Sequence, residues 1–161
     1  MLSWLKNVWD RVGRRDTRSA RAADGARGEQ AAADFLQARH GFTIVTRNWH
    51  SSRDRRDELD LVCRDGDVLV FVEVKARAEG AQVSGYHAVD ERKRRALRRA
   101  VHTYLAGLTR PPRTFRFDIA EVTLSGRLPS QVLHFKNLPL FPKGYHVVRQ
   151  SGSLGSVPGG L

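Results

Sequence analysis

The sequence predicts an α/β sandwich in which helices flank a mixed central β-sheet. Two segments have helical periodicity, and runs of Val, Leu, Ile and Phe with turn signals between them indicate strands. The length of 161 residues and a hydrophobic fraction of 40% suit one domain with a real core. We divide the chain into a basic N-terminal extension with a linker (residues 1–24), an α/β domain (25–148) and a disordered Gly- and Ser-rich tail (149–161).

The chain carries a large excess of positive charge. Lys and Arg total 28 and Asp and Glu total 17, which gives a net charge of +11. This excess favours binding to nucleic acid, although a basic ribosome-associated protein or a merely soluble one has the same balance. Cys63 is the only cysteine, which rules out an intrachain disulfide and fits a reducing compartment. No apolar run reaches the length of a membrane-spanning helix, and we expect a cytoplasmic protein.

Helical spacing occurs in three places. The first is the N-terminal extension, a basic amphipathic segment that can touch a membrane surface or nucleic acid or pack on the domain, with residues 18–25 as a linker. The second is residues 25–40, a helix that ends at Gly41. The third is residues 89–108, whose apolar face is surrounded by Arg92, Lys93, Arg94, Arg95, Arg98 and Arg99. This last helix suits a nucleic-acid backbone, but a solvated helix face has the same composition.

The strands are predicted around these helices. Residues 42–49 give the first strand, residues 57–77 a β-hairpin that turns at Asp65-Gly66, and residues 115–124 and 131–135 a final ribbon. In that ribbon Arg116 and Asp118 share a face, and we expect them to form a structural ion pair.

Charged residues interrupt the hairpin strands, which otherwise look buried. They are Glu58, Asp60, Glu73 and Lys75. An ionised side chain in such a position is costly unless it is paired or binds a metal. These four residues therefore mark the candidate functional site.

The register of the hairpin decides whether this site can form. With Asp65 and Gly66 as the turn, Arg64 faces Asp67, and Asp60 lies diagonal to Glu73 at roughly 7 Å between Cβ atoms. Lys75 falls on the same face. A three-residue turn without a bulge would instead place the two acids on opposite faces.

The chemistry of the acid pair suits a hard cation. Mg²⁺ or Mn²⁺ is typically held by one or two carboxylates together with water and substrate phosphates, so Asp60 and Glu73 can supply the anionic edge. Lys75 could lower the pKa of the attacking water or orient it, while the cation stabilises the charge that develops on a phosphodiester.

Two further features have open alternatives. Glu29 lies on the apolar stripe of the helix at residues 25–40, where it either turns toward the acid pair or stays in solvent as a first-turn glutamate. The segment before the hairpin contains three arginines that either grip phosphates or form a solvated loop: Arg53, Arg55 and Arg56.

Asp60 and the run Val-Phe-Val-Glu73-Val-Lys75 resemble the PD-(D/E)xK signature of restriction-endonuclease-like nucleases. Together with Gly28-Glu29 and Arg116-Phe117-Asp118, they make residues 25 to about 122 resemble the YraN family of uncharacterised bacterial proteins. That family is itself similar to archaeal Holliday-junction resolvases. The resemblance implies a restriction-endonuclease-like sandwich and, by analogy, a metal-dependent DNA endonuclease acting on linear or branched substrates.

The resemblance also implies roles for individual residues. Asp60, Glu73 and the backbone carbonyl of Val74 would hold Mg²⁺ or Mn²⁺, Lys75 would assist the water, and Glu29 would be a further metal or water ligand. The resemblance points to Lys93 for contact with nucleic acid, and from the charge pattern we expect further contacts from Arg53, Arg55, Arg56, Arg77 and Arg94.

Four points stay open. By analogy with enzymes that cut junctions, the protein would be a homodimer. The competing interpretation is a non-catalytic nucleic-acid-binding module on a nuclease-like scaffold, and nothing in the sequence separates DNA from RNA. The family pattern usually has Gly where this chain has Asp57, which could widen the anionic cluster or disturb the start of the strand.

Overall fold

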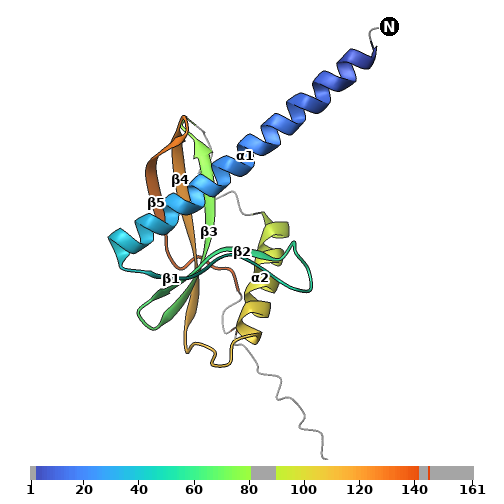
Figure 1. Ribbon diagram of the computed structural model, residues 1–161. Helices are drawn as coiled ribbons and strands as arrows, with labels where there is room; N and C mark the ends of the chain where they lie inside the picture. The colour runs from blue at the N-terminus through green and yellow to red at the C-terminus, as the bar shows by residue number, and fades with distance from the viewer. Residues whose placement is uncertain (1–2, 81–89, 142–144, 146–161) are drawn as a thin grey trace, which may run out of the picture.

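The computed structural model describes residues 3–80, 90–141 and 145, which form two helices and five strands (Figure 1). Helix α1 spans Ser3–His40 and helix α2 spans Glu91–Ala106. The strands are β1 (Thr43–His50), β2 (Glu58–Asp65), β3 (Val68–Ala78), β4 (Phe115–Ser125) and β5 (Leu128–Phe135). The tail predicted at residues 149–161 lies outside the described residues.

The strands form one mixed sheet in the order β1-β2-β3-β4-β5. Neighbouring strands are antiparallel except for β3 and β4, which are parallel. A parallel pair needs a crossover connection, and α2 lies in the chain between these two strands. The predicted mixed central sheet with flanking helices is therefore confirmed.

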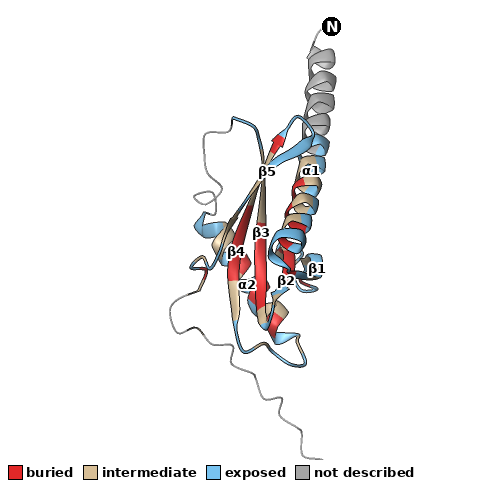
Figure 2. Cartoon of the chain, turned by 90° about the vertical axis from the view of Figure 1, so that its left-hand side faces the viewer, coloured by how far each residue is buried: buried red, intermediate tan, exposed pale blue. Residues whose placement is uncertain are grey.

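The two helices bury different faces of the sheet. Helix α1 packs Ala33 and Leu36 into a cluster that contains Leu61 and Val72, whereas α2 packs Leu97 into a separate cluster. Figure 2 shows that the buried residues concentrate on the central strands, between the helices. Because the central strands are covered on both faces, β3 is apolar at every position from Val68 to Val72. A charged residue in β3 is accordingly an exception that needs a reason.

Helix α1 continues without interruption through residues 18–25, so the linker predicted there is wrong. The segment is mostly Arg and Ala, which are strong helix formers, and its single glycine costs only about 1 kcal/mol in a helix. The helix ends where the sequence predicts. Gly41 adopts a φ of 68°, and its N–H donates to the carbonyl of Gln37.

The hairpin forms, but its register differs by two residues from the predicted one. Asp65 pairs with Val68, so the loop consists of Gly66 and Asp67. Gly66 has a φ of 57°, and a turn with positive φ at its first loop position favours glycine there. Because the shift is an even number of residues, the paired residues Leu61 to Asp65 keep the faces that the predicted register gives them.

The predicted ion pair between Arg116 and Asp118 is confirmed, and it belongs to a larger buried group. Arg116 Nε lies 3.1 Å from Asp118 Oδ1. Asp118 also lies 2.9 Å from His134 Nε2 and accepts a hydrogen bond of 2.8 Å from the N–H of Asn137. These contacts join β4 to β5 and to the segment that follows it.

Close packing between α1 and β3 gives a first prediction. A Cβ atom added at Gly28 would lie 2.7 Å from the Cβ of Ala76, whereas one added at Gly25 would meet nothing within 4 Å. We expect Gly28→Ala to lower the free energy of unfolding by about 1–3 kcal/mol, because α1 must move away from the sheet. The matched change Gly25→Ala should raise it by about 1 kcal/mol through helix propensity. Urea titration followed by circular dichroism measures both, and equal effects would contradict the close packing.

Candidate active site

A break in the side-chain alternation of β1 and β2 creates the candidate site. Arg47 pairs with Leu61, and Trp49 with Leu59. Leu61 packs on the α1 side of the sheet, but Leu59 and Trp49 pack on the α2 side, although residues two apart in a regular strand share a face. The reversal falls on the residues between these pairs, Asn48 in β1 and Asp60 in β2.

The backbone explains part of this break. Asn48 has a φ of 48°, in the left-handed region that Asn tolerates better than most residues. On the other side of Asp60, the recorded pairing of β2 with β3 ends at Leu61 and Val72. Beyond that point the N–H of Val74 donates to Oδ2 of Asp60 at 2.7 Å. The carboxylate of Asp60 is thus fixed at the place where the strands separate.

Glu73 is the buried acid of the site. Its side chain is only 2% exposed, and two lysines contact the same oxygen. Lys75 Nζ lies 2.8 Å from Glu73 Oε1, and Lys93 Nζ from helix α2 lies 3.1 Å from it. The other oxygen, Oε2, is buried and has no hydrogen-bond partner among the described residues. A buried carboxylate oxygen without a donor is a position that a cation would satisfy.

Burial and the nearby Glu73 shift the pKa of Asp60. Burial, followed by the negative charge of Glu73, raises the pKa of Asp60 to about 7, against the opposing effects of the Val74 N–H and of Lys93. Burial alone would lower the pKa of Lys93, but the charges of Glu73 and Asp60 outweigh it and raise that pKa. The site therefore favours additional positive charge next to Asp60.

Glu29 approaches the site from the other layer. It lies on α1, and its negative charge is the smallest of the causes that raise the pKa of Asp60. However, no three His, Cys, Asp or Glu side chains within residues 3–80, 90–141 and 145 form a group that could hold a metal ion. The carboxylates available to a cation are therefore the pair Asp60 and Glu73, and the role of Glu29 stays a prediction.

The residues predicted to contact nucleic acid fall into two groups. Lys93 contacts Glu73, and Arg94 follows it on α2 and is partly exposed. Arg77, on β3, has its Nε 3.9 Å from Oε1 of Glu121. The second group lies on the loop between β1 and β2 and consists of Arg53, Arg55 and Arg56, all exposed.

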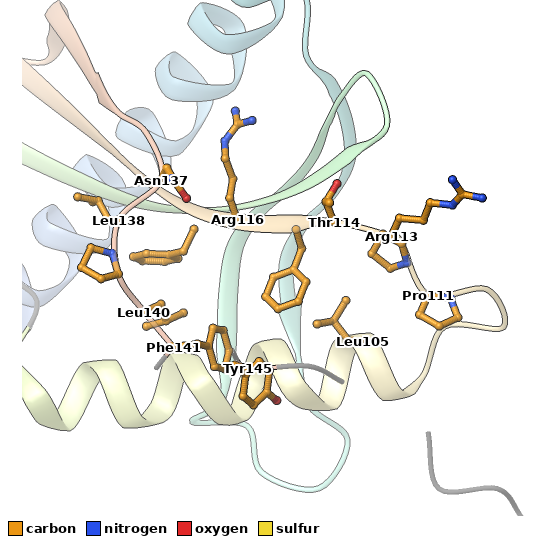
Figure 3. A pocket seen from close by; sticks show the side chains of 14 residues that line it. Leu105, Pro111, Arg113, Thr114, Arg116, Asn137, Leu138, Leu140, Phe141 and Tyr145 are labelled. Atoms are coloured by element: carbon orange, nitrogen blue, oxygen red, sulfur yellow. The ribbon is translucent and has the colours of Figure 1, made fainter. Parts of the chain in front are cut away.

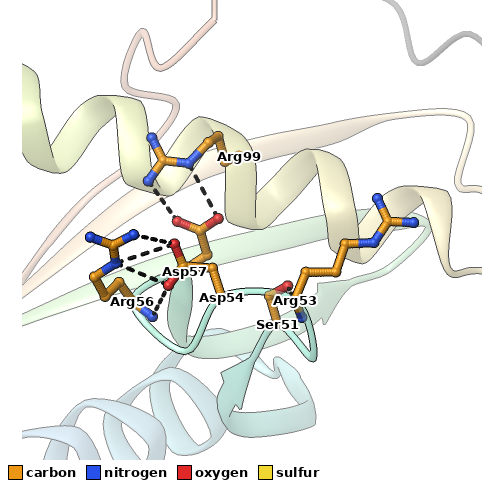
Figure 4. A network of polar contacts seen from close by, with 6 residues as sticks. All are labelled: Ser51, Arg53, Asp54, Arg56, Asp57 and Arg99. Atoms are coloured by element: carbon orange, nitrogen blue, oxygen red, sulfur yellow. Dashed lines mark hydrogen bonds and ion pairs between the residues drawn. The ribbon is translucent and has the colours of Figure 1, made fainter.

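That loop has an internal structure of its own (Figure 4). Arg56 pairs with Asp54 at 2.8 Å, and its hydrogen bonds lower the pKa of Asp54 to about 2. Asp57 is buried and accepts two hydrogen bonds from Arg99 of α2, at 2.7 and 3.2 Å. The charge of Asp57 is therefore compensated by Arg99. Strand β2 begins directly after Asp57, at Glu58.

Sequence analysis assigned no role to one residue of this site, Asn48. It supplies the left-handed residue opposite Asp60, and the signal available was an Asn within a strand that begins with β-branched residues. Glu58, one of the four charged residues that marked the site in the sequence, also contacts Lys93: its Oε1 lies 3.7 Å from Lys93 Nζ, which makes it a second acidic contact of that lysine.

A mixed five-stranded sheet packed against two helices, with two acids and a lysine at a strand break, defines an α/β protein consistent with the restriction-endonuclease-like fold. A family model described as "Uncharacterised protein family UPF0102" matches residues 28–122. The chain belongs to this family, which is the YraN family that the sequence resembles.

Several relatives carry the same family name. A UPF0102 protein of Geobacter metallireducens is 39% identical over 113 residues, which cover 70% of this chain and 88% of that protein. UPF0102 proteins of Nitratidesulfovibrio vulgaris and Anaeromyxobacter dehalogenans are each 44% identical; the aligned residues cover 66% and 71% of this chain and 77% and 82% of those proteins. None of these names assigns an activity.

Neither helix in the described part of the chain has the length and apolar content that a membrane crossing requires.

Proposed function

We propose that the protein is a metal-dependent endonuclease that hydrolyses DNA phosphodiester bonds, including those of branched DNA. The observation that carries this proposal is the buried Oε2 of Glu73, which has no hydrogen-bond donor among the described residues and belongs to the acid whose charge raises the pKa of Asp60. Two crowded carboxylates with one unsatisfied oxygen fit Mg²⁺ or Mn²⁺, which prefer oxygen ligands. The carbonyl of Val74 is a third oxygen of the same segment.

Four residues have roles in the proposed hydrolysis. Asp60 and Glu73 hold the cation, which supplies Lewis-acid stabilisation of the phosphate charge. Lys75 Nζ, now bound to Glu73 Oε1, orients the attacking water and stabilises the negative charge that develops at the phosphorus oxygens. Lys93 contacts the same carboxylate from α2 and orients it.

The surface around the site supports nucleic acid as the substrate. Helix α2 carries a row of basic side chains that leads away from Lys93, and the net charge of the chain is +11. Such a surface attracts the phosphate backbone without regard to base sequence, with an affinity that falls steeply as salt rises. The nucleic-acid strand bound by this surface would then be the one that is hydrolysed at Asp60 and Glu73.

The experiment that tests the proposal is a cleavage panel with the full chain. Linear, nicked, flapped and four-way DNA and a matched RNA are incubated with Mg²⁺, Mn²⁺ or EDTA. We expect cleavage of at least one DNA in the presence of metal and none in EDTA. No cleavage of any substrate with either metal would refute the nuclease proposal.

The competing function is a nucleic-acid-binding module without turnover. One observation favours it: two lysines already contact Glu73, and the described residues offer no third acid within a metal-binding group. Calorimetric titration of Mn²⁺ into the wild type and into Asp60→Asn separates the two cases. Heat that disappears in the variant supports the metal site, whereas the absence of heat in both proteins supports the binding module.

A further inference from the structure

A hollow lies beside α2, the helix from which Lys93 reaches Glu73. Its volume is about 450 Å³, and it lies between the β1–β2 loop, α2 and the segment after β5. Its lining residues are Ser51, Arg53, Asp57, Arg98, Arg99, His102, Thr103, Phe141 and Tyr145. Pockets of about 300–1,000 Å³ accommodate small organic ligands, so a single nucleotide is within its range.

One wall of this hollow is aromatic. The rings of Phe141 and Tyr145 are stacked, with centroids 4.2 Å apart and planes inclined by 21°. Figure 3, which draws an adjacent pocket that shares these two rings, shows Phe141 and Tyr145 side by side at α2. Phe141 is anchored by an edge contact with Phe115, and Arg98 Nε donates to the carbonyl of Leu140 at 2.7 Å. A flat ring placed against Tyr145 would extend a stack that already exists.

The remaining lining is cationic. The one acid, Asp57, has both oxygens bound by Arg99, and Arg98 is paired with Glu91. Arg53 lines the hollow and is exposed, and none of the ion pairs among the described residues involves it. The guanidinium group of Arg99 is largely exposed on its outer side. An anionic group beside the aromatic stack would therefore meet arginines without meeting a free carboxylate.

We propose that this hollow binds one unpaired nucleotide of the substrate strand, with its base stacked on Tyr145 and its phosphate held by Arg53 and Arg99. The proposal rests on the nuclease function proposed above and names its substrate class: DNA with an unpaired nucleotide near the cut, such as a flap or a branch. Arg99 lies six residues along α2 from Lys93, a rise of about 9 Å. That distance corresponds to roughly two or three nucleotide steps of a stacked strand, at about 3.4 Å each.

Binding in EDTA tests this site without cleavage. The full chain is titrated into a short single strand that carries a fluorescent adenine analogue, whose emission falls when it stacks, and into a blunt duplex. We expect Tyr145→Leu to weaken single-strand binding by about 5- to 100-fold and to abolish the quenching, because base–aromatic stacking is lost. Tyr145→Phe keeps the ring and should bind and quench like the wild type. Arg53→Ala should weaken single-strand binding, whereas Arg127→Ala removes the same charge from an exposed turn and serves as the control.

The outcomes are distinct. Single-strand affinity and quenching in Tyr145→Leu and Arg53→Ala equal to those of Arg127→Ala would overturn the nucleotide site, even if the wild type cleaves DNA. Quenching that depends on Tyr145 in a protein that cleaves nothing with Mn²⁺ would support the nucleotide site and refute the nuclease function. Loss of duplex binding by the same factor as single-strand binding would also overturn the site, because unpaired bases would then play no part.

Discussion

Lys75→Ala should lower the rate of metal-dependent DNA cleavage by about 10²–10⁴-fold, the range typical of a lost proton-handling or charge-stabilising group. Lys75 Nζ contacts Glu73 at 2.8 Å, and no other lysine of β3 can replace it. The DNA affinity should change little, since 28 − 1 = 27 of the Lys and Arg residues remain. Single-turnover cleavage with Mn²⁺ gives the rate, and fluorescence anisotropy in EDTA gives the affinity.

The matched control for this change is Lys136→Ala. It removes the same side chain and charge from an exposed position near the ring of Phe42, away from the acid pair. We expect its cleavage rate to stay within about threefold of the wild type, because additivity holds for sites without shared partners. Equal rates for Lys75→Ala and the wild type would remove Lys75 from the reaction.

Asp60→Asn should stabilise the metal-free protein at pH 8 while abolishing metal binding. The pKa of Asp60 is raised to about 7 in the folded protein, well above that of an unfolded aspartate. Ionising it at pH 8 therefore costs up to about 4 kcal/mol of folding free energy, which an uncharged asparagine avoids. The amide oxygen of Asn can still accept the hydrogen bond from Val74.

The sign of the pH dependence follows from the raised pKa. Between about pH 4 and pH 7 the folded protein binds one more proton at Asp60 than the unfolded chain does, so this residue makes stability fall as pH rises through that window. Thermal unfolding in EDTA at pH 5 and pH 8 should therefore show a smaller loss in Asp60→Asn than in the wild type. An identical loss in the two proteins would contradict the crowding of the two acids.

Asp118→Asn provides a control with the opposite sign. Burial alone would raise the pKa of Asp118, but hydrogen bonds from His134 and Asn137 and the charge of Arg116 lower it. The ionised form of Asp118 thus stabilises the fold above the pKa of an unfolded aspartate, and this contribution is lost as pH falls through the lowered value. The same chemical substitution should therefore destabilise the protein at pH 8.

Metal binding should offset the folding free energy that is lost when Asp60 ionises. Mn²⁺ at 100 times its dissociation constant stabilises a protein by about 2.7 kcal/mol, and this gain should appear in the wild type and not in Asp60→Asn. Below pH 7 the cation competes with a proton on Asp60, so its affinity should fall by about tenfold per pH unit.

Local patterns were sufficient to predict the elements and the acid pair. Alternation, glycine at turns and helical spacing depend on residues close in the chain, and they located all five strands, helix α2 and the end of α1 at Gly41. They also predicted that Asp60 and Glu73 lie close together, and the charge of Glu73 does raise the pKa of Asp60. The exact pairing was wrong because Asp65-Gly66 and Gly66-Asp67 are both acceptable turns, and strand packing selects between them.

The linker predicted at residues 18–25 shows another limit of local patterns. A change in composition suggested a boundary, but Arg and Ala continue a helix whatever their charge, and α1 is unbroken there.

The amino-acid sequence by itself was enough to predict the family and the α/β class. It also selected Asp60, Glu73 and Lys75 as the candidate site residues. All of these predictions depend on short-range order along the chain. Tertiary structure alone decided the break at Asn48 and Asp60, the reach of Lys93 across to Glu73, and the stacking of Phe141 on Tyr145 against α2. These contacts join segments far apart in the chain, or depend on which face of the sheet a helix covers. They form only when the burial of both faces of one sheet brings those segments together.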